Sequence, residues 1–146
     1  MKAWSCMTGN QVDRARQWEE TERWLSRVDQ DLAAVMALLR ESLVDPAALH
    51  CQQAAEKLAK AFIVAMGASP PKTHDIEELA EIATGYNLEF GAKLRDLGSL
   101  TRWYLTVRYP VGSGEAEPSF PDVQQAHARI RVLRHAIEAF APQPGK

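Results

Sequence analysis

The sequence predicts an all-α protein, folded as an up-and-down bundle of four to five helices. Apolar residues recur at intervals of three and four along most of the chain, which is the period of an amphipathic helix. No segment alternates apolar and polar residues as a half-buried strand does, and short breaks rich in proline or glycine separate the periodic segments. Long helices joined by short turns bury their apolar stripes by packing antiparallel to one another.

The first helix is expected to begin near Trp18, because residues 1–16 are polar and show no helical period. Its apolar stripe consists of Trp18, Leu25, Val28, Leu32, Val35 and Leu39. We therefore interpret residues 1–16 as an N-terminal extension, residues 17–141 as the helical domain and residues 142–146 as a C-terminal tail.

Asp45 and Pro46 predict the start of a second helix, with the aspartate as N-cap and the proline at the first helical position. Its core stripe is expected to contain Cys51, Ala55, Leu58, Phe62 and Ala65. Gly67 is expected to end this helix. Thr73 is then expected to cap a third helix that ends at Gly85.

A fourth helix is expected from about Glu89 to Thr106, with Tyr109 and Pro110 marking its end. Its apolar residues are Leu94, Leu97, Trp103, Tyr104 and Val107. The following segment, VGSGEAEPSFP, has no period and predicts an exposed loop, a kind of segment that often carries function. The last helix shows a clean stripe: Val123, Ala126, Ile130, Leu133, Ile137 and Phe140.

Composition limits the classes of function that the chain can serve. Hydrophobic residues make up 46% and charged residues 25%, as in an average soluble domain. The net charge of −2 does not favour general binding to duplex DNA. Cys6 and Cys51 have no spacing with histidine that suggests a metal site, so we expect no metal, no cofactor and a reducing compartment. Without an apolar leader or a membrane span, the expected location is the cytoplasm.

The second helix carries a polar ridge on the face opposite its predicted core stripe. Gln52, Glu56 and Lys60 follow one another at intervals of four, and Gln53 and Lys57 lie beside them. This ridge is either a solvated surface reinforced by a pair between Glu56 and Lys60, or a contact for a phosphate group or a protein partner.

Three further residues lie where helices are expected to begin or end. His74 follows the expected cap Thr73, where it could meet a ligand or order the turn. Arg108 and Tyr109 precede the loop, where they could bind a phosphate and stack a base, or satisfy helix carbonyls. The last helix also carries a basic set, either a contact for an anionic partner or its solvated side: His127, Arg129, Arg131, Arg134 and His135.

Four segments in order resemble the HEPN family (higher eukaryotes and prokaryotes nucleotide-binding), over roughly residues 18–140. They are WLSRVDQDLAAVMALL, HCQQAAEKLAKAFIVAMG, THDIEEL and VRYP. The resemblance implies a helical bundle, often a homodimer, with a possible site for a nucleotide or RNA. It also implies a frequent partner, a minimal nucleotidyltransferase, with which such proteins form toxin–antitoxin or related pairs.

Many proteins of this family are metal-independent ribonucleases whose motif is an arginine followed, after four to six residues, by a histidine. Arg108 resembles the motif arginine, but the positions due to hold histidine are Ser113, Gly114 and Glu115. Arg129 and His135 satisfy the spacing, yet six helical residues separate their directions by about 120°. The sequence therefore favours a non-catalytic module over an endoribonuclease that would use Arg108, or Arg129 and His135.

Three hypotheses follow. The first is a dimeric, non-catalytic module that binds a nucleotide or a nucleotidyltransferase through Gln53, Glu56, Lys57, Lys60, His74, Arg108 and Tyr109. The second is the ribonuclease toxin. The third is a structural adaptor whose interface is made by its exposed aromatic residues Trp4, Trp18 and Trp103. The first requires the turn after Val107 to lie beside the ridge that holds Lys57.

Overall fold

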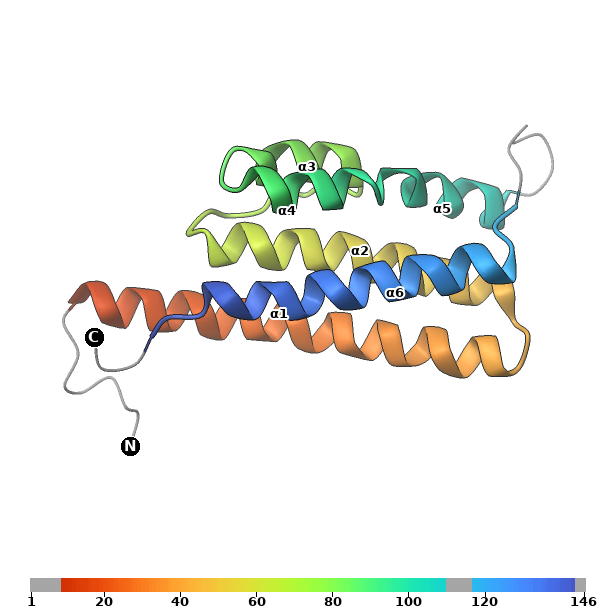
Figure 1. Ribbon diagram of the computed structural model, residues 1–146, viewed down its shortest axis with the longest axis horizontal. Helices are drawn as coiled ribbons and strands as arrows, with labels where there is room; N and C mark the ends of the chain where they lie inside the picture. Colours follow the sequence, from red (N-terminus) through yellow and green to blue (C-terminus); the bar gives the residue numbers. More distant parts are fainter. Residues whose placement is uncertain (1–8, 110–116, 144–146) are drawn as a thin grey trace.

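The computed structural model describes residues 9–109 and 117–143, and all the regular structure in these ranges is helical. Two long helices, α1 (Gly9–Arg40) and α2 (Val44–Ala65), run antiparallel, and α6 (Phe120–Ala136) lies along them (Figure 1). Three shorter helices cover another side of α2: α3 (Ile76–Thr84), α4 (Leu88–Arg95) and α5 (Thr101–Arg108). The prediction of an all-α bundle is confirmed.

Helix α2 lies at the centre of the bundle, where it packs against α1, α3, α5 and α6. Its sequence suits this position because alanines allow the neighbouring helices to approach closely; those that are fully buried are Ala47, Ala48, Ala54, Ala55, Ala59 and Ala61. Neighbours on several sides mean that its polar residues are also covered. No helix within the described ranges is long and apolar enough to cross a membrane.

Three phenylalanines connect the central helix α2 to α4 and to the C-terminal 3₁₀ helix. The rings of Phe62 on α2 and Phe90 on α4 are stacked, with centroids 4.0 Å apart. Phe140, in the 3₁₀ helix η3 (Ile137–Phe140), meets both rings edge to face, with centroids 5.4 Å from Phe62 and 6.4 Å from Phe90. The predicted stripes of α1 and α6 likewise face this core.

The first helix begins at Gly9 rather than near Trp18, so its start was predicted too late. Nothing between these positions breaks a helix, and the polar residues there suit a helix that projects beyond the core. Gln17 also ties this segment to the end of α2, because its Nε2 donates to the Ala65 carbonyl at 2.8 Å.

The predicted fourth helix is divided. Helix α4 ends at Arg95, a 3₁₀ turn, η2 (Gly98–Leu100), follows, and α5 begins at Thr101. The chain passes so close to α3 at Gly98 that a Cβ there would lie 2.4 Å from Cγ of Glu77. After this turn α5 continues alongside α2 (Figure 1).

Two predicted helix caps are wrong. The N-cap of α2 is Leu43, without a side-chain hydrogen bond, so Asp45 and Pro46 lie inside its first turn. The cap of α3 is Asp75, whose carboxylate accepts from the Glu77 amide at 3.0 Å. Thr73 instead accepts from the Asp75 amide and donates to Glu78. The predicted ends at Gly67 and Gly85 agree with the structure, and Gly67 has the positive φ of +88° that favours glycine.

Candidate functional site

A pocket of about 480 Å³ lies where α5 runs beside α2. Its wall combines amides, charged groups, a phenol ring and an aliphatic side chain: Gln52, Gln53, Glu56, Lys57, His74, Thr101, Tyr104 and Leu105. The polar ridge of α2 forms one side, the linker before α3 contributes the histidine, and α5 forms the other side. The pocket therefore brings together three segments that are separate in the sequence.

Glu56 is the centre of a hydrogen-bonded group in this wall. Its carboxylate meets Lys60 Nζ at 3.2 Å, His74 Nδ1 at 2.9 Å and Gln52 Nε2 at 3.4 Å. Only 3% of Gln52 and 8% of Lys60 is exposed. The interpretation of the ridge as a solvated face is thus wrong for these two residues, because α2 has neighbours on this side as well. The expected pair between Glu56 and Lys60 is present.

Lys57 is held by a second carboxylate, on α1. Asp31 is 6% exposed, and its two oxygens contact Lys57 Nζ at 2.7 Å and His50 Nδ1 at 3.0 Å. This ion pair fixes the ammonium group at the edge of the pocket, where the lysine remains partly exposed. Asp31 was not predicted as a site residue. The available signal was its position between Val28 and Leu32, a carboxylate beside an apolar stripe.

Helix α5 presents one face to the pocket through Thr101, Tyr104 and Leu105, which are three and four residues apart. Tyr104 is 40% exposed, so part of its ring is available for contact. The guanidinium carbon of Arg108 lies 4.5 Å from the centre of this ring, within the range of a cation–π interaction. Thr101 Oγ1 accepts from the Ile76 amide at 3.1 Å and so attaches α5 to the start of α3.

The structure brings together only some of the seven predicted binding residues. Gln53, Glu56, Lys57 and His74 line the pocket directly. Arg108 touches it through Tyr104, Lys60 is buried behind Glu56, and Tyr109 is exposed and is not part of the wall. Three lining residues were not predicted as binding residues, Thr101, Tyr104 and Leu105, and Gln52 was placed on the ridge but not among the seven. Their signal was the same-face spacing on each helix, which becomes informative only when the two helices are placed side by side.

The basic set on the last helix is less uniform than predicted. His127 is buried, and desolvation holds the pKa of its imidazole below the usual value. Arg134 is bound to Asp29 on α1 at 2.8 and 3.1 Å and to Glu138 at 2.8 Å. Arg131 remains exposed. The prediction of a continuous basic exposed face is therefore wrong at His127 and Arg134, because both help to attach α6 to the bundle.

The structure gives no support to a ribonuclease pair on this helix. Arg129 lines a groove of about 370 Å³ together with Lys93 of α4 and its C-cap Asp96, whereas His135 is exposed and does not line that groove. Ser113, Gly114 and Glu115, where the resemblance would place a histidine, lie outside the described residues. Cys51 is buried as expected, and burial raises the pKa of its thiol to about 12, so it is not an activated nucleophile.

The aromatic residues named for an adaptor surface are not freely exposed. Trp18 and Trp103 are partly buried and pack against the core. Trp4 lies outside the described residues. The prediction of an interface built from exposed tryptophans is therefore wrong for the two that can be placed.

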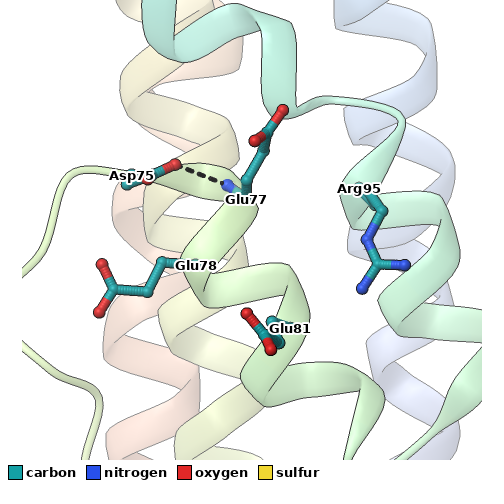
Figure 2. A pocket seen from close by; sticks show the side chains of 5 residues that line it. All are labelled: Asp75, Glu77, Glu78, Glu81 and Arg95. Carbon is teal, nitrogen blue, oxygen red and sulfur yellow. Dashed lines mark hydrogen bonds between the residues drawn. The ribbon is translucent and has the colours of Figure 1, made fainter.

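An acidic pocket of about 470 Å³ lies between α3 and α4 (Figure 2). Its wall consists of four carboxylates from α3 and its N-cap and one arginine from α4: Asp75, Glu77, Glu78, Glu81 and Arg95. Within the described ranges, no group of three or more His, Cys, Asp or Glu side chains is arranged to hold a metal ion. The negative charge of this acidic pocket would repel a phosphate, so the pocket between α2 and α5 is the better candidate for an anionic ligand.

Comparison with known proteins assigns the chain to a family. A family model described as HEPN domain matches residues 21–140, which include the whole pocket and the greater part of the chain. No curated protein and no solved structure gives a significant match. Because the model covers the central and later helices alike, the chain belongs to the HEPN domain family.

Proposed function

We propose that the protein is a non-catalytic nucleotide-binding module whose ligand occupies the pocket between α2 and α5. Membership in the HEPN family supports a nucleotide-binding or ribonuclease-type module. The observation that carries the proposal is the presence in one pocket of a fixed cation, Lys57, and a partly exposed ring, Tyr104. A nucleotide needs both: a positive group for its phosphate and a flat surface for its base.

The remaining wall suits such a ligand. Tyr104 and Leu105 offer a ring and an aliphatic surface for a base. Arg108, which lies over the Tyr104 ring, restricts the orientation of that ring. The amide of Gln53 is exposed and can both donate to and accept from a base edge or a ribose hydroxyl. Glu56 does not oppose the phosphate strongly, because its carboxylate is paired with the Lys60 ammonium group and hydrogen-bonded to His74.

Calorimetric titration with AMP, GMP, CMP and UMP tests the proposal. For the nucleotide that binds best, Tyr104→Ala is expected to weaken binding about tenfold, since stacking of a base on an aromatic ring contributes about 1–3 kcal/mol. Lys57→Gln should also weaken it by removing the charge opposite the phosphate. The matched controls are Tyr86→Ala, an exposed tyrosine just after α3 and outside the pocket, and Lys93→Gln on α4. No binding of any nucleotide, or equal losses in the Tyr104 and Tyr86 variants, would contradict the proposal.

A ribonuclease is the second candidate, supported by the family and by the literal spacing of Arg129 and His135. Single-stranded RNA incubated without metal with the wild type, Arg108→Ala and His135→Ala decides between the candidates. We expect no cleavage by the wild type. Cleavage that either substitution abolishes would replace the non-catalytic proposal.

We further propose that the module acts as a homodimer in the cytoplasm and pairs with a minimal nucleotidyltransferase, as in a toxin–antitoxin pair. The support is the family together with the exposed aromatic side chain at the end of α5, Tyr109, which lies outside the pocket wall. Light scattering should give twice the chain mass, and the affinity-tagged protein should retain the nucleotidyltransferase encoded beside it. A monomer that retains no such enzyme would contradict this part of the proposal.

A further inference from the structure

A second pocket, of about 390 Å³, lies on the α1 side of Lys57. It is lined by one residue of α2 and four of α1: Lys57, Glu20, Arg23, Trp24 and Arg27. Lys57 also lines the pocket between α2 and α5, so the two pockets share this side chain. A single cation that faces two cavities marks the place where one ligand could pass from the first cavity into the second.

The helical register of α1 places these groups on the side that faces α2. Trp24, Arg27 and Asp31 follow one another at intervals of three and four, and Asp31 is the carboxylate that holds Lys57. Trp24 is partly buried against the core, which fixes its ring at the wall of the second pocket. The second pocket therefore repeats the two features of the first, an aromatic ring and a positive charge.

The charges of the second pocket are not balanced within the described part of the chain. Arg23 and Arg27 are both exposed, lie four residues apart, and form no ion pair or hydrogen bond with any described residue. Like charges at this spacing on one helix repel each other. Glu20 is the one acidic residue of the wall, so the two arginines leave the pocket with an excess of positive charge.

We infer that the ligand of this protein is a strand of at least two linked nucleotides, not a mononucleotide. This inference rests on the proposed function. One base stacks on Tyr104, the phosphate between the nucleosides lies at Lys57, the second base lies against Trp24, and the second phosphate lies between Arg23 and Arg27. An acidic peptide would use the same cations but would leave both rings without a matching group.

The test compares AMP, the dinucleotide pApA and inorganic pyrophosphate as ligands of the full chain. The dinucleotide is expected to bind at least tenfold more tightly than AMP, and pyrophosphate more weakly than pApA. Replacing both arginines, Arg23→Gln with Arg27→Gln, should lower the ratio of pApA to AMP affinity to near one. In this double variant, the slope of the logarithm of the pApA binding constant against the logarithm of salt concentration should decrease in magnitude by about 0.7. This is the contribution of one phosphate contact on a single strand.

Two controls separate the subsite from general electrostatics. Arg40→Gln with Arg95→Gln removes the same charge from exposed positions outside both pockets and should keep the affinity ratio of the wild type. Trp24→Phe keeps an aromatic ring in the core but removes the indole. In the wild type pApA should quench tryptophan fluorescence more than AMP does, and this difference should disappear in Trp24→Phe. Circular dichroism confirms that each variant is folded.

The outcomes distinguish this inference from the proposed function. If AMP binds in a manner that depends on Tyr104 while pApA binds no more tightly, the proposed function stands and the second subsite is wrong. If pyrophosphate binds as tightly as pApA, the second pocket selects anions and not nucleotides, which also overturns the inference. If neither AMP nor pApA binds, both proposals fail.

Discussion

Glu56 illustrates how one residue links stability to the binding site. Its carboxylate holds the buried Lys60, the exposed His74 and the buried Gln52 at the same time. A buried ammonium group that loses its partner carries a large desolvation penalty, whereas replacing both members of a pair by neutral groups is nearly neutral. The group is therefore suited to a double-mutant cycle.

Glu56→Gln is expected to lower the free energy of unfolding by about 2 kcal/mol. The effect is smaller than for an ion pair fully excluded from water, because the side chains of Glu56 and Lys60 both keep some contact with water. Lys60→Met should have a smaller effect, because Glu56 keeps His74 as a partner. The double variant should be more stable than the sum of the single effects implies. Guanidinium denaturation followed by circular dichroism measures all three, and strict additivity would show that the pair does not contribute.

His127 predicts a pH dependence of stability. Burial lowers the pKa of this imidazole in the folded state below the value of about 6.5 expected in the unfolded chain, so the unfolded state takes up the proton first as the pH falls. Its contribution to stability is present above about pH 6.5 and decreases below it. Urea denaturation at pH 7.5 and pH 5 should show a smaller loss in His127→Gln than in the wild type. His135→Gln, at an exposed position of the same helix, should behave as the wild type.

At the level of elements, the turn from α3 to α4 depends on a glycine. A Cβ at Gly91 would lie 2.6 Å from the backbone of Thr84, so the two helices approach each other more closely than any other residue allows. An alanine in a helix normally adds about 1 kcal/mol relative to glycine. Gly91→Ala should instead destabilise the protein by about 1–3 kcal/mol, because the helices must move apart.

Gly9→Ala is the matched substitution, since nothing lies within 4 Å of a Cβ at that position. It should be neutral or slightly stabilising in the same thermal unfolding measurement. A Gly91→Ala protein as stable as the wild type would show that α3 and α4 can separate without loss of packing.

The sequence predicts the helices that bury one stripe and fails where tertiary contacts decide. The stripes of α1 and α6 follow from their period, since each helix faces the core on one side. The break between α4 and α5 does not follow, because Gly98 disfavours a helix only weakly and the close approach of Glu77 is what fixes the turn. Asp75 and Thr73 are both good capping residues, and the local sequence does not determine which of them caps α3. In the structure the cap is Asp75.

For the whole molecule, Cys51 serves as a reporter of global unfolding. It is fully buried on α2, and burial raises the pKa of its thiol to about 12, so almost no thiolate is present at pH 8. In a Cys6→Ser variant, a disulfide reagent should label Cys51 at a rate that follows the fraction of unfolded protein across a urea gradient. Rapid labelling in the absence of urea would mean that the bundle opens locally around α2.

The candidate site was only partly predictable because α2 is enclosed by other helices. A helix with a single core face would expose Gln52 and Lys60 on its opposite side, as the pattern suggests. Here α1, α3, α5 and α6 all pack on α2, so these polar residues are buried and Lys57 is fixed by Asp31. Single-sequence periodicity describes one helix at a time and does not show how many neighbours each helix has.

The position of the α5 wall of the pocket depends partly on contacts with α3, which lies outside that wall. Thr101 at the start of α5 binds the first amide of α3, and the turn before it rests against Glu77, which is not part of the pocket wall. The width of the cavity is therefore adjustable from a distance. Random libraries restricted to α3 should yield variants with altered ligand preference although every residue at the cavity is retained.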